Sequence, residues 1–124
     1  MSQALTAGTS GFGHEEIADG RQTIADTDGV DAILTALNDD DCRTILQTVS
    51  DSDERLSAAE LSDRCDVPLS TMYRKLEMLT DAALLEERLR IKRSGKHTSE
   101  YGQRIADVRV SVDSGAGIEL ELAQ

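Results

Sequence analysis

The spacing of the apolar residues changes near Ala83, and this change constrains the fold more than any other feature of the chain. Before it, apolar residues recur every three or four positions, as in Met72, Leu76 and Leu79, which is the period of a helix packed on one face. From Leu85 they alternate with charged residues, which is the period of a strand with one buried face. The pattern therefore predicts an α+β fold in which helices come first and hairpins follow.

Two helices joined by a tight turn are predicted over residues 57–82. Ser57 and Glu60 have the S-x-x-E spacing of a capping box, in which each side chain accepts a backbone N–H of the first turn. Pro68 disfavours helical backbone at the residue before it and so ends this helix. We expect Ser70 to cap the second helix, which runs to about residue 82.

The segments before residue 57 predict two further helices and an arm. Apolar spacing indicates helices over residues 30–37 and about 41–50, and the acidic run between them offers an N-cap. Residues 1–29 are rich in Gly, Ala, Thr and Ser. We therefore expect a flexible arm there, with a short helix near residues 14–24.

The segments after residue 83 predict two hairpins. Strands over residues 85–92 and 98–105 flank a Ser-Gly-Lys turn, and the alternation resumes on both sides of a turn over residues 113–117. The order helix, helix, helix-turn-helix, hairpin is that of a winged helix-turn-helix domain with an α-α-α-α-β-β core. The predicted organisation is therefore an arm (1–29), this domain (30–105) and an additional C-terminal hairpin (106–124).

Charge is distributed unevenly along the chain, whose formal net charge is −11 from 24 acidic residues and 13 Lys and Arg. Residues 67–104 hold 5 acids and 8 bases, a balance of +3, whereas residues 1–66 and 105–124 have balances of −11 and −3. A chain with this net charge repels DNA, so the basic segment is the part suited to contact it. The acid excess, with three lysines, indicates a protein from a halophile, and an ordinary acidic protein is the alternative.

The second helix of the pair and the hairpin after it carry the side chains that a DNA-binding domain needs. A helix fits the major groove of B-DNA and reads base edges with polar or cationic side chains near its N-terminus. A hairpin with cations two residues apart presents them on one face to the DNA backbone or the minor groove. The candidate DNA-binding residues are Ser70, Thr71, Tyr73, Arg74 and Lys75 in the helix, and Arg88, Arg90, Lys92, Arg93, Lys96 and His97 in the hairpin.

Three stretches, SAAELSDRC (57–65), VPLSTMYRKL (67–76) and LTDAALL (79–85), resemble the ArsR/MarR-type winged-helix transcription regulators, and the resemblance covers about residues 30–105. It implies a sequence-specific regulator that binds a pseudo-palindromic site in double-stranded DNA as a homodimer. Together with the acidic composition, it implies an archaeal regulator of the oxidative-stress response. Many relatives have Gly where Ala83 stands, because the helix there ends in a left-handed turn.

Other functional classes have less support in the sequence. The chain has no paired carboxylates, nucleophile–base set or Gly-rich phosphate loop, so we do not expect an enzyme. Cys42 and Cys65 lack metal-ligand spacing, so neither a metal nor an organic cofactor is expected. Both thiols fit apolar helix faces, which leaves a redox sensor and a buried small side chain as alternatives. No segment has the length of a membrane span and no signal peptide is evident, so we expect a cytoplasmic protein.

Two further expectations concern the partner. If the chain works in molar salt, we expect K⁺ or other cations at the DNA interface, where they bridge carboxylates and phosphates. The alternative function is a winged-helix domain that binds protein and has lost DNA binding. The basic hairpin argues against this alternative, because a protein-binding domain has no need of it.

Overall fold

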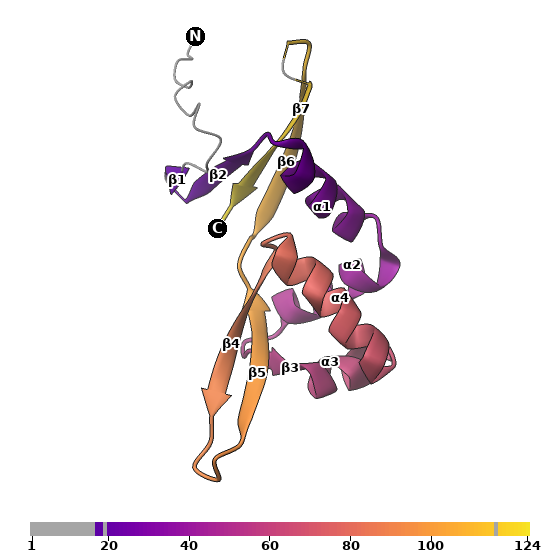
Figure 1. The fold of residues 1–124 in the computed structure, drawn as a ribbon, viewed down its shortest axis with the longest axis vertical. Helices are drawn as coiled ribbons and strands as arrows, with labels where there is room; N and C mark the ends of the chain where they lie inside the picture. Colours follow the sequence, from indigo (N-terminus) through magenta and orange to yellow (C-terminus); the bar gives the residue numbers. More distant parts are fainter. Residues whose placement is uncertain (1–16, 19, 116) are drawn as a thin grey trace. The chain divides into compact units, whose positions relative to one another are not determined.

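The computed structural model describes residues 17–18, 20–115 and 117–124 (Figure 1). The described residues divide into two compact units, one of residues 31–104 and one in which the described residues before 31 and after 104 come together. Each unit contains its own antiparallel sheet, and the two units are described in turn.

The helices are α1 (Thr27–Leu37), α2 (Asp40–Asp51), α3 (Ala58–Cys65) and α4 (Leu69–Asp81). The predicted helices over 30–37 and 41–50 and the predicted helix pair are thus confirmed. Asp39 is the N-cap of α2, and its carboxylate accepts the Cys42 backbone N–H at 2.9 Å. None of the helices in the described part of the chain is long and apolar enough to cross a membrane.

The capping box that opens α3 is formed as predicted. Ser57 Oγ accepts the Glu60 backbone N–H at 3.2 Å, and Glu60 Oε1 accepts the Ser57 backbone N–H at 2.9 Å. The helix ends where Asp66 adopts left-handed backbone with φ of 56°, and Val67 N–H donates to the Ser62 carbonyl at 3.2 Å. A capping box therefore fixes the start of this short helix, and left-handed backbone with a backbone hydrogen bond fixes its end.

The start of α4 differs from the prediction. Ser70 does not cap it, because α4 begins at Leu69 with Pro68 in the N-cap position. Pro68 has a φ of −56° and no side-chain atom that can accept a backbone N–H, so the helix begins there without a side-chain cap. Ser70 instead lies in the first turn of the helix, where it is exposed.

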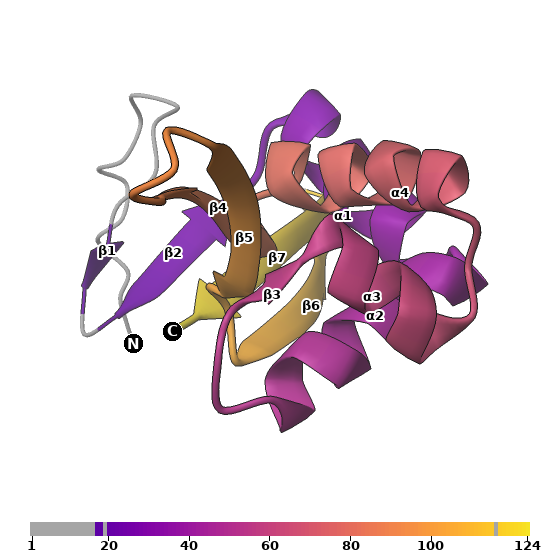
Figure 2. The ribbon, with the colours of Figure 1, turned by 90° about the horizontal axis from the view of Figure 1, so that it is seen from below.

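The core of the 31–104 unit is aliphatic, as the low aromatic content requires. Figure 2 shows α3 and α4 side by side, and the buried side chains come from every helix and from the base of the sheet. The most buried large side chains of this unit are Ile33, Ile45, Leu56, Leu61, Met72, Leu76, Leu79, Leu84 and Leu85. This core seats α4 on its Met72–Leu76–Leu79 face, as the sequence predicted.

The sheet of this unit has the order β3-β5-β4. It consists of β3 (Leu56–Ser57), β4 (Leu85–Ile91) and β5 (His97–Gln103), and β4 and β5 form the predicted hairpin. Figure 1 shows this hairpin extending beyond the helices, in the manner of a wing. The domain is therefore the predicted winged helix-turn-helix, and β4 with β5 is called the wing below.

The wing differs from the prediction in its burial. Its apolar face was expected to be half-buried along its length, but only Leu85 and Tyr101, near its base, are buried on that face. Leu89 and Ile91 are 58% and 74% exposed. The alternation of the sequence predicts which side chains share a face, but the projecting hairpin has no neighbouring layer of the described unit to cover that face.

The second unit is built around a sheet with the order β1-β2-β7-β6. Its strands are β1 (Ile17–Ala18), β2 (Arg21–Ile24), β6 (Asp107–Asp113) and β7 (Gly117–Ala123). The predicted C-terminal hairpin is thus formed by β6 and β7. Leu120 and Leu122 of β7 are fully buried, and Arg21 of β2 pairs with Glu121 of β7 at 2.8 Å.

The helix predicted near residues 14–24 is wrong over the described positions, where the chain forms β1 and β2. Residues before 17 lie outside the described part of the chain. In β2, Gln22 and Ile24 are buried while Arg21 and Thr23 are exposed, so the period is two rather than three or four. Pairing with β7 buries this segment, and a short segment of low apolar content gives little sign of that pairing in its own sequence.

The end of α4 is closed by a left-handed residue, as the family resemblance implied. Ala83 has a φ of 61°, its N–H donates to the Thr80 carbonyl at 3.0 Å, and the Leu84 N–H donates to the Leu79 carbonyl at 3.0 Å. These two bonds make a Schellman motif, which usually has glycine at the left-handed position. Because the methyl group of alanine crowds its own backbone there, Ala83 is strained.

We predict that Ala83→Gly stabilises the protein. Removing the methyl group relieves strain of about 1–2 kcal/mol, and the extra freedom of glycine in the unfolded chain offsets about 0.5–1 kcal/mol of that gain. The measurement is the free energy of unfolding in urea at constant molar KCl. The matched control is Ala82→Gly, which should destabilise the protein, because Ala82 is buried and has right-handed backbone. Equal effects of the two substitutions would show that Ala83 is unstrained.

Candidate nucleic-acid interface

The first turns of α4 present polar side chains to solvent. Ser70, Tyr73 and Arg74 are exposed, with Tyr73 at 56%, and Thr71 is half-buried. Within the described chain no side chain caps this end of the helix. Its first backbone N–H groups, at the positive end of the helix dipole, are therefore suited to accept a phosphate.

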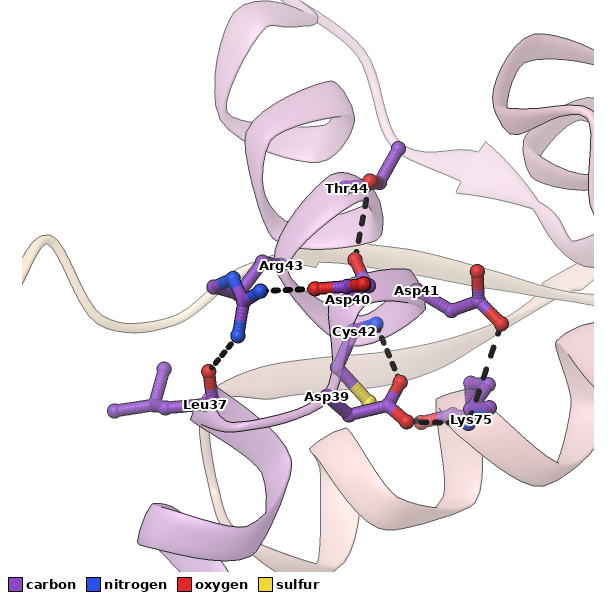
Figure 3. A network of polar contacts seen from close by, with 8 residues as sticks. All are labelled: Leu37, Asp39, Asp40, Asp41, Cys42, Arg43, Thr44 and Lys75. Atoms are coloured by element: carbon purple, nitrogen blue, oxygen red, sulfur yellow. Dashed lines mark hydrogen bonds and ion pairs between the residues drawn. The ribbon is translucent and has the colours of Figure 1, made fainter.

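Lys75 is the exception among the predicted helix residues, and its assignment to the DNA surface is wrong. The residue is only 8% exposed, and its Nζ lies 2.6 Å from Asp39 Oδ1 and 4.0 Å from Asp41 Oδ2 (Figure 3). Lys75 comes three residues after Met72 and four before Leu79, so it lies on the same face of α4 as these two apolar residues. This spacing is the sequence signal that could have predicted that the aliphatic part of the Lys75 side chain packs against the core.

Asp39 therefore has two roles at the start of α2. It caps the helix and it is the counter-ion of Lys75, and the hydrogen bond from Lys75 holds the pKa of Asp39 below its ordinary value. In Figure 3 its carboxylate lies between the Cys42 backbone and the Lys75 ammonium. An ion pair with a hydrogen-bonded counter-ion thus fastens α4 to the N-terminus of α2.

The two cysteines occupy different environments. Cys42 is fully buried, and burial, followed by the nearby Asp39 carboxylate, raises the pKa of its thiol to about 12. Such a thiol stays protonated and unreactive at neutral pH. Cys65 is half-buried on α3, and its Sγ lies 3.5 Å from Thr48 Oγ1. Of the two alternatives for Cys42, the buried small side chain is the one that the structure supports.

Two of the wing cations are already paired with acids of the wing itself. Arg90 lies 3.1 Å from Glu100 on β5, and Arg88 lies 3.7 Å from Glu86 on its own strand. Glu86 also accepts a hydrogen bond from Arg55 at 2.9 Å. Arg88 and Arg90 share a face, as predicted, whereas Lys92 follows the end of β4, and the charge of the two arginines is partly compensated by Glu86 and Glu100.

Arg55 reaches Glu86 by lying across β5 at Gly102. A Cβ atom built on Gly102 would stand 2.7 Å from Nη1 of Arg55, so no larger residue fits there while the arginine keeps this position. The pair fixes the base of the wing to the segment before α3.

The tip of the wing carries uncompensated charge. Lys92, Arg93, Lys96 and His97 are exposed, and within residues 20–115 no ion pair is formed by the three Lys and Arg of this group. The Gly95 N–H donates to the Lys92 carbonyl at 3.0 Å, and Gly95 has a φ of 85°. The turn therefore holds three cations on a short loop.

The two faces of the wing have different neighbours. On one face, Glu87 is opposite Tyr101 in register, and Leu89 and Ile91 lie further along it. Burial raises the pKa of Tyr101, and the charges of Glu87 and of Tyr73 on α4 raise it further, so this face adjoins the exposed turn of α4. Arg90 on the other face lies near Glu60 of α3, whose pKa it helps to lower after the larger effect of the Ser57 backbone.

Besides the burial of Lys75, the site differs from the predicted set in the wing face that lies near α4. Tyr73 of α4 lies near Tyr101 on the apolar wing face, whereas Arg90 on the other face lies near Glu60 of α3. The sequence showed which residues share a face, but the side on which α4 lies depends on how the sheet packs on the helices. Leu89 and Ile91 were missed as surface residues because their alternation resembles that of core residues.

Comparison with protein families supports the helix-turn-helix part of this fold. A family model described as a helix-turn-helix domain matches residues 32–88, which include α2, α3, α4 and the start of the wing. A search of curated proteins gives no match. A solved structure described as a possible transcriptional regulator from Methanosarcina mazei Go1 is similar, with 21% sequence identity and a TM-score of 0.48. The match covers 60% of this chain and 63% of that chain.

We predict that Lys75→Met lowers the free energy of unfolding by about 2 kcal/mol, because it leaves the Asp39 carboxylate part-buried without its counter-ion. Because the pKa of Asp39 is lowered in the folded chain, the stabilisation is present above its ordinary value of 3.8 and is lost as the pH falls through the lowered pKa. The difference between the two proteins in urea unfolding should therefore shrink in acid.

The control for this prediction is Arg74→Met, which removes a cation from the neighbouring, exposed position of the same helix. It should change stability by less than about 0.5 kcal/mol. If Lys75→Met were as mild as Arg74→Met, the ion pair would not fasten α4 to α2.

Proposed function

We propose that this chain is a sequence-specific DNA-binding transcription regulator that acts as a homodimer on a pseudo-palindromic site in double-stranded DNA. The observation that carries the proposal is the exposed polar start of α4 beside a projecting wing with an uncompensated cationic tip. The helix-turn-helix match over residues 32–88 supports it. We do not propose catalysis or a cofactor, since the exposed residues of this surface are suited to hydrogen bonds and charge contacts.

In this proposal α4 enters the major groove, which is about 12 Å wide. Arg74 has the fork of donors that recognises guanine, and Tyr73 can donate to a phosphate or stack on a sugar. Ser70 and the backbone at the start of α4 contact the phosphate that flanks the groove. Lys75 remains in its ion pair and has no place in the contact.

The wing contributes in two ways. Lys92, Arg93 and Lys96 at its tip contact phosphates, which positions the protein without reading sequence. Leu89 and Ile91, on the face beside α4, can lie against sugars or the walls of the minor groove. Arg88 and Arg90 contribute less than the tip, because Glu86 and Glu100 already hold them.

We predict that Arg74→Ala weakens binding to a specific duplex about 5- to 150-fold, the value of a bidentate base contact of about 1–3 kcal/mol. The specific duplex is one selected by the wild-type chain from a random-sequence pool, and affinity is measured by fluorescence anisotropy in molar KCl. Binding to random duplex should change little. Replacing Lys92, Arg93 and Lys96 with glutamine should weaken binding to both duplexes by the same factor.

Arg43→Ala is the charge-matched control, because Arg43 is exposed on α2 and paired with Asp40. It should leave both affinities unchanged. A wild-type chain that selects no sequence from the pool would contradict the proposed function. An Arg74→Ala effect of equal size on both duplexes would contradict the role of Arg74 in base recognition.

A salt-tolerant interface is part of the proposal. Ordinary DNA binding weakens steeply with salt, because each phosphate contact releases condensed counter-ions. The acids beside the contact surface, such as Glu87 on the α4 side of the wing, offer sites where K⁺ can bridge carboxylate and phosphate. The uptake of K⁺ then offsets the release of counter-ions.

We therefore predict a shallow dependence of the dissociation constant on KCl, with specific binding retained at molar concentration. Glu87→Gln should make the dependence steeper, since it removes one site of cation uptake. The measurement is an anisotropy titration at several KCl concentrations. Complete loss of binding at molar KCl in the wild-type chain would rule out cation uptake.

The signal that the regulator answers is a separate hypothesis. The family resemblance and the acidic composition suggest the oxidative-stress response of a halophilic archaeon. Cys42 is unsuited to direct sensing, so the candidate thiol is Cys65. If Cys65→Ser leaves DNA binding responsive to peroxide, direct sensing at this thiol is excluded.

The compensated charges of Arg88 and Arg90 favour a second candidate function, a winged-helix domain that binds a protein. The same selection experiment separates the two functions. Such a domain would select no DNA sequence at any KCl concentration.

A further inference from the structure

The outer strand of the four-stranded sheet contains three valines on one face, and the side chains of two of them, Val110 and Val112, are exposed. β6 is an edge strand, and β7 lies on one side of it. Val110 and Val112 are 54% and 80% exposed, and Ile118, opposite Val112 on β7, is 42% exposed. A long edge strand with an apolar face is a template for pairing with another strand.

The hydrogen bonds of β7 show which groups of β6 face outward. The Gln124 N–H donates to the Gly20 carbonyl at 2.9 Å, beyond the end of β2. Because successive residues of a strand bond to opposite neighbours, Leu122 and Leu120 also bond toward β2, and Ala123, Glu121 and Glu119 bond toward β6.

The partners of those last three residues on β6 are Asp107, Arg109 and Ser111. The alternate residues Val108, Val110 and Val112 therefore direct their N–H and C=O groups away from the sheet, along its open edge. Their side chains lie on the same face as the buried Leu120 and Leu122, because directly opposite residues share a face.

We propose that the open edge of β6 pairs antiparallel with β6 of a second copy of this chain, with Val110 on the two-fold axis. This inference deepens the proposed function, because it names the surface through which the homodimer forms. Val110 pairs with its own copy and Val108 with the partner's Val112, so about six N–H···O=C bonds form. The two four-stranded sheets become one continuous sheet.

The charged residues of β6 are compatible with pairing to a second copy of the strand. Antiparallel pairing about Val110 sets Arg109 opposite the other copy's Ser111 and diagonal to its Asp113, which is within reach of a long side chain. Arg109 also lies 3.7 Å from Asp107, the acid that comes opposite Asp113 at each end. A basic residue therefore stands between the acids of the two strands at both ends of the contact.

The opposite edge of the sheet does not compete for this pairing. β1 has two residues, so it offers few backbone groups. β6 has seven residues and no proline or lysine, the residues that commonly protect an edge. A second copy offers the same seven residues in a matching register, which a two-fold interface requires.

The test is the oligomeric state in molar KCl without DNA, measured by analytical ultracentrifugation over a range of concentrations. We expect the wild-type chain to have twice the 13.4 kDa mass of one chain. Val110→Pro should be monomeric, because it removes an outward N–H but no bond to β7, and proline is tolerated at such edge positions. Val110→Thr, which keeps the N–H and the branched shape, should remain dimeric.

If Val110→Pro does not unfold cooperatively in urea, a second variant tests whether β6 forms the dimer contact. Val112→Lys places a charge at an 80% exposed position of the same edge and should also be monomeric. Leu89→Lys is its control, since Leu89 is an exposed strand residue of the wing, and it should remain dimeric. A monomeric wild-type chain, or a folded Val112→Lys variant that stays dimeric, would overturn the proposal.

A cross-link tests the register. In the Cys65→Ser background, Val110→Cys places two thiols across the axis with Cα atoms about 5.5 Å apart, a separation that a disulfide can span. Thr23→Cys, exposed on β2, should give no cross-link. Cross-linking through Ser111→Cys in place of Val110→Cys would overturn the register.

DNA binding is measured separately on a duplex that carries a single half-site. Half-site binding by a chain that forms no β6 dimer contradicts this inference and leaves the proposed function standing. A β6 dimer that binds no DNA contradicts the proposed function and leaves this inference standing.

Discussion

The ion pair between Lys75 and Asp39 determines which side chains α4 presents to solvent. It places one cation of α4 against α2, and the cost of burying that cation is met only because Asp39 is held in place as the cap of α2. The start of one helix and the orientation of another thus depend on a single carboxylate. With Lys75 turned inward, the side chains one and two positions before it, Arg74 and Tyr73, must point to solvent. The polar surface of α4 is therefore a consequence of how the helix is fastened.

Much of the winged domain could be predicted from local chemistry. Several features depend only on residues close together in the sequence. They are the helix caps at Ser57 and Asp39, the helix end before Pro68 and the change of period after Ala83. The exact first residue of α4 could not be predicted, because Pro68 and Ser70 are both suitable starts and packing selects between them. The apolar spacing of α4 could have shown that Lys75 faces inward, but its partner Asp39 on α2 could not be predicted from the sequence.

The parts that could not be predicted depend on contacts between distant segments. β2 is a strand because β7 pairs with it, and nothing within residues 21–24 shows that partner. Alternation correctly grouped Leu89 with Ile91 and Arg88 with Arg90, but it could not show that the wing projects from the core. Nor could it show that Glu86 and Glu100 hold the two arginines. A net charge of +3 over a segment therefore overstates the charge that this segment offers to a partner.

The contact of Arg55 with Gly102 couples two positions that are far apart in sequence. Glycine at 102 leaves the space in which the guanidinium lies, and the guanidinium in turn occupies a groove that a bare glycine would leave open over β5. Neither residue is useful there without the other, so natural variants should exchange both positions together. Among related chains, a residue larger than glycine at position 102 would therefore indicate that the base of the wing is held by a residue other than arginine.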